Sequence, residues 1–303
     1  MSATASIQLP AGRQGPGPTP SALVDALDLV VARRAGSRLP GERPAPGVGM
    51  GTELSQLRPY QPGDDVRQLD PAATARTGIP HVRLHVPERL LTTWLALDVS
   101  PSMAFGTADR LKADVAEGVV SVVGRLAIRR GGRVALLTSG GPSDRFLPPR
   151  SGRGALVRLA RVLAEGVAAD GAGDEAGLAR TLARLGRIAR QPGLVVVVSD
   201  FRGPRTWRRP LAALGNRHSL LAIEIRDPRE ASLPEVGHLA LVDPETGRRV
   251  EVDSSDGRLR ERYAAAERAE REAVAADLRR GRAEHVVLST AGPWLKALGR
   301  SLR

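Results

Sequence analysis

The sequence predicts an α/β fold: a doubly wound, mainly parallel sheet with a small N-terminal accessory α+β region. From residue 91 onward, short apolar runs alternate with segments of helical periodicity, as is typical of parallel sheets with helical crossovers. Two of these runs end at Asp98 and Asp200, where the strands of such a sheet present their polar ends. The 303 residues, 42% of them hydrophobic, suffice for one large domain and a small one.

The first 90 residues differ in pattern from the rest of the chain. Residues 1–20 are rich in Pro and Gly and predict a disordered tail. Residues 21–34 carry apolar residues at helical spacing after a serine and predict an accessory helix. Residues 40–87 are broken by prolines and glycines and end in an alternating run, which predicts loops and short strands. The expected organisation is therefore a tail (1–20), an accessory helix and β-region (21–90), and a main domain (91–303).

In the main domain, a strand at 92–98 leads into a helix at about 107–129, which has an apolar stripe through Val115 and Val119. A turn at 243–247 between two alternating runs predicts a β-hairpin. The remaining predicted elements are strands at 133–138, 145–147, 193–199, 219–225 and 284–288, hairpin strands at 237–242 and 248–252, and helices at 154–165, 175–190, 207–214 and 256–280.

Composition excludes several classes of protein. The chain has no cysteine, which rules out disulfides, thiol catalysis and cysteine-ligated metal centres. No stretch approaches 18 apolar residues without charge, and residues 1–20 lack the order of a signal peptide. We therefore expect a cytoplasmic protein without a membrane span.

The net charge of +12 raises the question of nucleic-acid binding. Arginines gather in residues 121–165 and 180–217, whereas Lys112 and Lys296 are the only lysines, a bias that GC-rich coding also produces. Aromatic residues make up 3% of the chain, which leaves few platforms for stacking bases. An arginine-rich nucleic-acid-binding protein is accordingly the alternative function.

The strand at 92–98 ends in Asp98, followed by Ser100 and Ser102. These side chains supply hard oxygen ligands, which suit Mg²⁺ or Mn²⁺ rather than zinc. The strand at 193–199 is followed by Asp200, a second carboxylate expected at the same edge. The alternative is structural: the two aspartates accept hydrogen bonds from neighbouring loop amides and hold no metal.

With these elements the chain resembles a von Willebrand factor A-type domain with a metal-ion-dependent adhesion site. From about residue 40 it more closely resembles the bacterial domain of unknown function 58 family, through Glu88-Arg89, Asp243-Pro244-Glu245-Thr246-Gly247 and Tyr263. It departs from that family's pattern at Leu54 and Pro71. The accessory region carries the rest of the family motif, namely Glu53, Arg58, Tyr60, Asp64, Asp65, Arg67, Asp70 and Arg76.

The resemblance implies a metal site formed by the aspartate and two serines after the first strand, a threonine from a middle loop and an aspartate after the fourth strand. Asp98, Ser100, Ser102 and Asp200 match this set. The middle loop has no hydroxyl residue, although Asp174 could substitute for the threonine. The resemblance therefore implies a degenerate site for Mg²⁺ or Mn²⁺.

The expected function is a non-enzymatic protein-interaction module. No phosphate loop, zinc-protease motif or nucleophile elbow is present, so catalysis has no evident centre. The resemblance implies a MoxR-type AAA ATPase as partner and an unidentified client protein. In the accessory region, Asp64, Asp65 and Arg67 predict a structural turn paired with Arg58 or Arg76. A rim favouring an acidic partner is predicted from Arg202, Arg205, Arg208 and Arg209.

Overall fold

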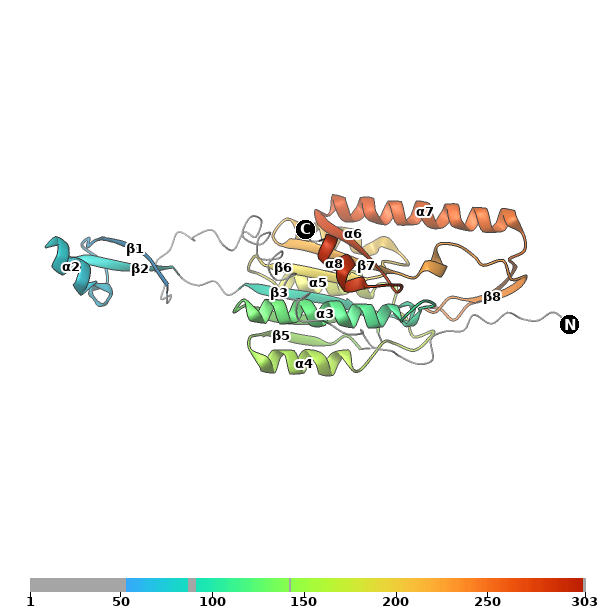
Figure 1. The fold of residues 1–303 in the computed structure, drawn as a ribbon, viewed down its shortest axis with the longest axis horizontal. Coiled ribbons are helices and arrows are strands. Elements are labelled where there is room, and N and C mark those ends of the chain that lie inside the picture. Colours follow the sequence, from blue (N-terminus) through green and yellow to red (C-terminus); the bar gives the residue numbers. More distant parts are fainter. Residues whose placement is uncertain (1–52, 87–90, 142, 302–303) are drawn as a thin grey trace. The chain divides into compact units, whose positions relative to one another are not determined.

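The computed structural model describes residues 53–86, 91–141 and 143–301 (Figure 1). Contacts divide the chain into two units, one within residues 40–90 and the other containing residues 91–303. The tail predicted at 1–20 and the helix predicted at 21–34 lie outside the described residues. Among the described helices, none has the length and apolar character needed to cross a membrane.

The smaller unit is built on an antiparallel pair, β1 (Glu53–Pro59) and β2 (His81–Val86). Between them lie a 3₁₀ turn, η1 (Val66–Gln68), and a short helix, α2 (Pro71–Thr77). The pattern predicted loops and strands here, not a helix. The helix forms because Asp70 caps it by accepting a 2.8 Å hydrogen bond from Ala73 N, and Pro71 suits the first helical turn.

The family motif of this unit serves its turns. Arg58 pairs with Asp64 through two hydrogen bonds of 2.7 and 2.8 Å, so Arg58 is the partner of this acid. Asp65 caps η1 by accepting a bond from the backbone of Arg67. The backbone N–H of Tyr60 donates to Pro80, which ties the two ends of the intervening segment together. Arg76 lies in the last turn of α2, and Glu53 begins β1.

The larger unit contains a six-stranded sheet in the order β10-β7-β6-β3-β4-β5. All neighbouring strands are parallel except β4 and β5, which confirms the predicted doubly wound, mainly parallel fold. The strands are β3 (Thr92–Asp98), β4 (Arg133–Ser139), β5 (Phe146–Arg150), β6 (Leu194–Ser199), β7 (Ser219–Arg226) and β10 (Ala283–Ser289).

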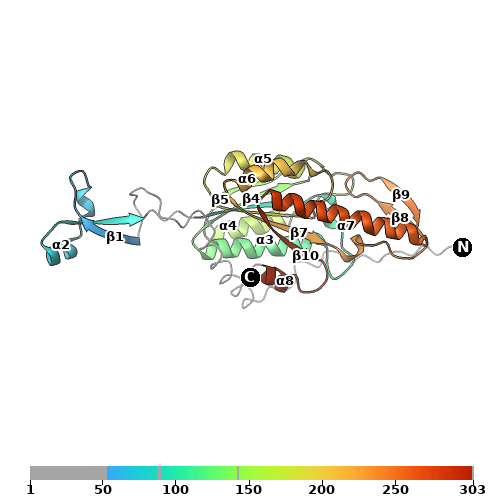
Figure 2. The same ribbon diagram turned by 90° about the horizontal axis from the view of Figure 1, so that it is seen from above.

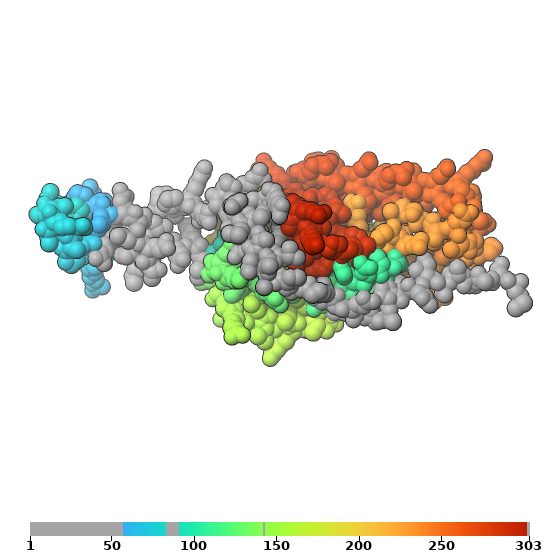
Figure 3. All heavy atoms as spheres, in the orientation of Figure 1, coloured from blue at the N-terminus to red at the C-terminus, as the bar shows by residue number. Residues whose placement is uncertain are grey.

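Helices cover both faces of this sheet (Figure 2). One face packs against α3 (Lys112–Arg129), α4 (Arg153–Leu163) and α8 (Trp294–Ser301). The other packs against α5 (Gly177–Ile188), α6 (Arg208–Gly215) and α7 (Gly257–Arg280). Helix α8 was not predicted. A separate hairpin, β8 (His238–Val242) and β9 (Arg249–Asp253), precedes α7, and the two form neighbouring surfaces in Figure 3.

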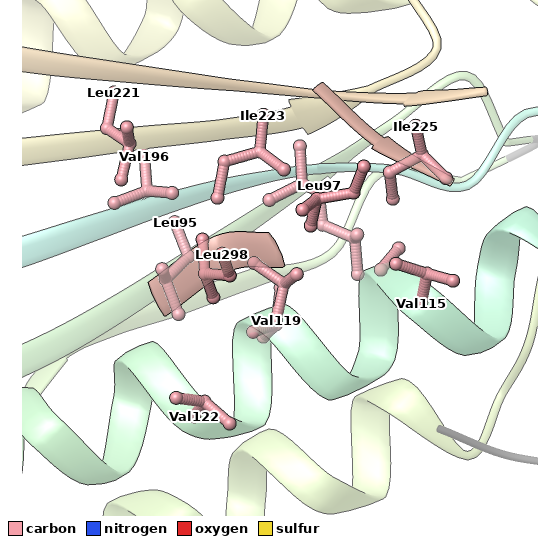
Figure 4. Close-up of a cluster of buried hydrophobic side chains, with 14 of the residues drawn as sticks. Leu95, Leu97, Val115, Val119, Val122, Val196, Leu221, Ile223, Ile225 and Leu298 are labelled. Carbon is pink, nitrogen blue, oxygen red and sulfur yellow. The ribbon is translucent and has the colours of Figure 1, made fainter. Parts of the chain in front are cut away.

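Alternation along β3 divides the core between the two faces. Leu95 and Leu97 meet Val115 and Val119 of α3 on one face (Figure 4). Trp94 and Ala96 point to the other face, against α5 and α6. Because successive side chains of a central strand enter different cores, the strand is apolar from Trp94 to Leu97.

Helix α3 begins five residues later than predicted. The backbone N–H of Leu111 donates to Asp114 Oδ2 at 2.9 Å, and Lys112 N donates to the carbonyl of Phe105 at 2.9 Å. Residues 99–111 therefore form an extended connection over the end of the sheet, including the 3₁₀ turn η2 (Pro101–Ala104). Because this connection ends at residue 111, the first residue of α3, Lys112, lies beside the strand ends.

Candidate functional site at the strand ends

Strands β3 and β6 are parallel neighbours, so their polar carboxyl ends meet at one edge of the sheet. Leu97 pairs in register with Val198, and the residues that follow are Asp98 and Ser199. The Ser199 hydroxyl donates a 2.6 Å hydrogen bond to Asp98 Oδ2. The structure thus brings Asp98 and Asp200 to the same edge, as the strand pattern predicts.

Asp98 is held by neutral donors. Its Oδ1 accepts a 3.0 Å bond from Ser100 N, and its Oδ2 accepts the Ser199 hydroxyl. The hydroxyl oxygens of Ser100 and Ser102 lie 3.1 Å apart, and both residues are buried. Burial, with a further contribution from the nearby carboxylate of Asp200, raises the pKa of Asp98 to about 6.

The loop after β4 approaches this aspartate closely. Gly140 has a φ of +84°, and a Cβ there would come within 2.9 Å of Asp98 Oδ1 and 2.7 Å of Ser100 Cβ. Glycine satisfies both demands, because it adopts positive φ without strain and leaves space for the carboxylate.

Asp200 is paired with a buried lysine that the sequence did not suggest. Lys112 Nζ lies 2.6 Å from Asp200 Oδ2 and 2.7 Å from Glu230 Oε1, and the lysine is fully buried. Burial by itself raises the pKa of a carboxyl, but the ammonium holds the pKa of Asp200 below its usual value. Burial likewise opposes the charge of Lys112, yet the two carboxylates raise its pKa above the ordinary range. Asp200 and Lys112 are therefore charged at neutral pH.

A carboxylate from the distant hairpin reaches the same edge. The turn between β8 and β9 places Glu245 Oε1 3.0 Å from the donating backbone N–H of Ser102. Pro244 accepts a 2.8 Å bond from Gly171 N, which holds the turn against the loop before α5. Asp243 organises the turn by accepting bonds from Glu245 N and the Thr246 hydroxyl. Ser102 and Glu245 are 143 residues apart in sequence.

Most of the predicted arginine rim is paired with acids of the same chain. Arg202 lies 2.7 Å from Glu267 of α7 and 3.0 Å from Glu230. Arg205 Nη1 lies 3.1 Å from Asp277, and Arg208 is 3.7 Å from the same carboxylate. Arg209 is exposed. Acids of α7, which the sequence interpretation did not include, therefore already occupy three of the four rim arginines.

The candidate from the middle loop forms hydrogen bonds within its own segment. Asp174, the candidate substitute for the threonine, accepts bonds from Ala176 N and from Arg180 Nη1 at 2.8 Å. The hydroxyl of Thr181, in the following helix, donates to the carbonyl of Thr138.

The hydrogen bonds of Asp98 and Asp200 determine how well the predicted ligands suit a divalent cation. Asp200 directs one oxygen at an ammonium group and the other at Arg202 N, and both oxygens of Asp98 accept hydrogen bonds. Within the described ranges, no cluster of three or more His, Cys, Asp or Glu residues suited to a metal occurs. The arrangement does not fit Mg²⁺ or Mn²⁺ held by Asp98, Ser100, Ser102 and Asp200, because a second cation would repel the ammonium of Lys112.

Four contributors to this edge escaped the sequence analysis: Lys112, Ser199, Glu230 and Glu245. One signal could have exposed the first, since Lys112 is one of two lysines in a chain with 45 basic residues. Ser199 ends the predicted strand 193–199 beside Asp200, whereas Glu230 and Glu245 approach the edge from segments whose position depends on the fold.

The fold and this edge define a doubly wound α/β protein with an acid–hydroxyl motif at its strand ends. The sequence profile described as "Protein of unknown function DUF58" matches residues 56–273, and the chain belongs to this family. It is 39% identical over 283 residues to "Uncharacterized protein Rv1480" of Mycobacterium tuberculosis, covering 93% of this chain and 89% of the relative. It is 38% identical over 157 residues to "Uncharacterized protein MAV169" of Mycobacterium avium, covering 52% and 92%.

Solved structures to which the chain is similar include the conserved hypothetical protein BatB of Bacteroides thetaiotaomicron. That likeness has a TM-score of 0.43 at 14% identity and covers 70% of this chain and 97% of the other. The SpRpn10 VWA domain gives a TM-score of 0.36 at 15% identity and covers 69% and 93%. The fold class stated above rests on the strand order, not on these likenesses.

Proposed function

We propose that this chain is a non-enzymatic protein-interaction module whose recognition face lies at the carboxyl ends of β3 and β6. One observation carries this proposal: the carboxylate of Glu245 already accepts a hydrogen bond from the backbone N–H of Ser102. A carboxylate presented on a turn therefore matches the shape and hydrogen bonding of this edge. A partner that offers an acidic side chain in a similar turn would compete with the hairpin for the same donor.

The partner that we propose is a MoxR-type AAA ATPase, with this chain as the adaptor that recognises a client protein. Family resemblance supplies this pairing. In that scheme the ATPase performs mechanical work and the chain supplies recognition. The groups at the edge support binding over catalysis, because the amine of Lys112 is occupied by two carboxylates and is neither a free nucleophile nor a free base.

The arginine rim contributes to partner binding by exchanging its acidic partners within the chain for acidic groups of the partner. A partner carboxylate that binds Arg202 or Arg205 must replace an acid of α7, so the net gain in binding free energy is small. Arg209 is exposed and has no ion-pair partner in the described part of the chain. We therefore assign the rim to orientation and association rate, with Arg209 as the rim residue that can bind without displacing an acid.

Nucleic-acid binding is the second candidate, and exposed arginines on α4 favour it. Arg153, Arg158 and Arg161 are exposed, and no ion pair of theirs occurs among the described residues. Such a row of cations could contact phosphates. The two candidates use different surfaces, so variants can separate them.

Binding of the purified chain to a purified MoxR-type AAA ATPase tests the proposal, with calorimetry as the readout. We expect binding by the wild type and about tenfold tighter binding by Glu245→Gln, because the loss of a hydrogen bond to a charged group releases the hairpin. Glu251→Gln, an exposed position on the same hairpin, is the matched control and should bind like the wild type.

The same proteins should be titrated with duplex and single-stranded DNA. Submicromolar DNA binding at physiological salt, lost when Arg153, Arg158 and Arg161 are replaced by Gln, would favour the second candidate. Absence of ATPase binding by both the wild type and Glu245→Gln would contradict the proposed partner.

A further inference from the structure

The edge described above contains a fully buried positive charge. Lys112 is the first residue of α3 and has 0% of its surface exposed. Its Nζ contacts Asp200 Oδ2 at 2.6 Å and Glu230 Oε1 at 2.7 Å, and lies 5.8 Å from the centre of the Phe105 ring. A charge in this position is tolerated only when it is paired and hydrogen-bonded on several sides.

The positive charge of Lys112 stabilises the buried carboxylates near it. Asp98 and Asp200 lie at adjacent strand ends, both buried, and interact with each other electrostatically. Two buried carboxylates repel unless a cation lies beside them. Arg202, which is 28% exposed, shares Glu230 Oε1 with Lys112 but reaches it from the rim. Within the described residues, Lys112 is the cation bonded to the Asp200 side chain.

The location is also the one at which the resemblance implies a divalent metal. Asp200 is the residue that would bind it from β6, and Asp98, Ser100 and Ser102 would bind it from β3. Here Asp200 binds an ammonium, and the threonine that completes the set is missing from the middle loop.

We propose that the ammonium group of Lys112 is the resident cation of this edge, taking the place of a divalent metal ion. The site then has its positive charge built into α3, and its geometry is set by folding and not by metal supply. The consequence is a recognition face that works equally in the presence and absence of Mg²⁺ or Mn²⁺. This inference concerns the isolated chain, so it can be tested before the partner is identified.

The chain offers a direct test, because Lys112 and Lys296 are its only lysines. Protein labelled with ¹³C and ¹⁵N in the lysine side chain gives two sets of NMR signals. Lys112 is buried and Lys296, in α8, is exposed, so the exposed residue serves as an internal control. Mn²⁺ is paramagnetic and broadens signals of nuclei close to it.

We expect millimolar Mn²⁺ to leave the Lys112 signal no broader than that of Lys296. Thermal unfolding of the wild type should be the same in Mg²⁺, Mn²⁺ and EDTA. Selective broadening of Lys112 at substoichiometric Mn²⁺, together with a saturable rise in Tm that Asp98→Ala abolishes, would overturn the proposal and restore the metal site.

A pair of variants tests whether the ammonium is needed. Lys112→Met keeps most of the side-chain volume but leaves Asp200 and Glu230 without their buried cation, and should lower Tm by more than about 6 °C. Lys296→Met should leave Tm unchanged. Equal Tm values for wild type and Lys112→Met in EDTA would overturn the proposal. If Lys112→Met does not fold, the Mn²⁺ measurement on the wild type still decides.

Discussion

Asp98, at the end of β3, and Glu224, in β7, are buried in the same sheet, yet their pKa values move in opposite directions. Ser199 links the two regions, because it bonds to Asp98 and is the register partner of Glu224. Burial raises the pKa of both carboxyls. Only the partners differ, and they decide the outcome.

Glu224 is surrounded by two guanidinium groups and an imidazole. Arg226 donates to it at 2.7 and 2.8 Å, Arg271 of α7 at 2.9 Å, and His285 of β10 lies 2.8 Å away. Burial opposes ionisation, but the hydrogen bonds from His285 and Arg226 lower the pKa to about 2. Glu224 thereby connects three elements of the fold and has no capacity for an external ligand.

Asp98 has hydroxyl and amide donors in place of cations, and the lysine nearby is bonded to Asp200. Its pKa of about 6 reflects burial without direct charge compensation. The comparison teaches that the sheet contains one buried acid with direct cationic partners and one buried acid whose hydrogen-bond donors are neutral.

The largest expected effect is that of Glu224→Gln, which removes the nearer of the two carboxylates paired with the buried guanidinium of Arg271, at 2.9 Å, and leaves Glu267 at 3.4 Å. We expect a loss of about 3–5 kcal/mol in the free energy of unfolding at pH 7, measured by urea denaturation. The folded pKa of Glu224 lies below its usual value of 4.5, so its contribution is present above pH 4.5 and is lost as pH falls toward 2. The variant should lack this acid-dependent loss. A variant as stable as the wild type would show that the cluster is not structural.

A smaller effect of opposite sign is expected for Asp98→Asn. The folded pKa of about 6 exceeds the usual 3.8, so this group favours the folded state below pH 3.8, and that contribution is lost as pH rises through 6. A neutral amide should therefore increase the free energy of unfolding at pH 7, on the order of 2 kcal/mol. Unfolding curves between pH 5 and 7 check this. Strong destabilisation would instead mean that the ionised carboxylate is balanced by a cation.

The smallest effect is expected where the carboxylate is exposed. Glu165 pairs with Arg145 at 2.7 Å, and the two side chains are 47% and 53% exposed. Glu165→Gln should change the free energy of unfolding by about 0.5 kcal/mol or less, because solvent screens the pair. The measurement uses the same urea series and serves as the reference for the two buried acids. A loss comparable to that of Glu224→Gln would remove burial as the basis of the comparison.

Local sequence pattern was sufficient for most of the main sheet. The apolar runs that end at Asp98 and Ser199 are strands, and they are parallel neighbours, because a run buried on both faces has few other places in an α/β fold. The sequence pattern did not predict the helices whose local signals are weak. Helix α8 is eight residues long, and α2 depends on the cap from Asp70 more than on an apolar stripe. The start of α3 was placed too early because the connection over the sheet edge contains apolar residues of its own.

The sequence by itself determined that Asp98 and Asp200 share an edge, since the carboxyl ends of parallel strands meet there whatever else surrounds them. Only the tertiary structure decided what those acids bind. Lys112 reaches Asp200 across 88 residues and Glu230 across 118, and Glu245 reaches Ser102 across 143. Such pairings follow from how loops and helices pack after the sheet has formed. Electrostatic balance in a buried site is a property of all the groups brought together, and no single stretch of sequence contains it.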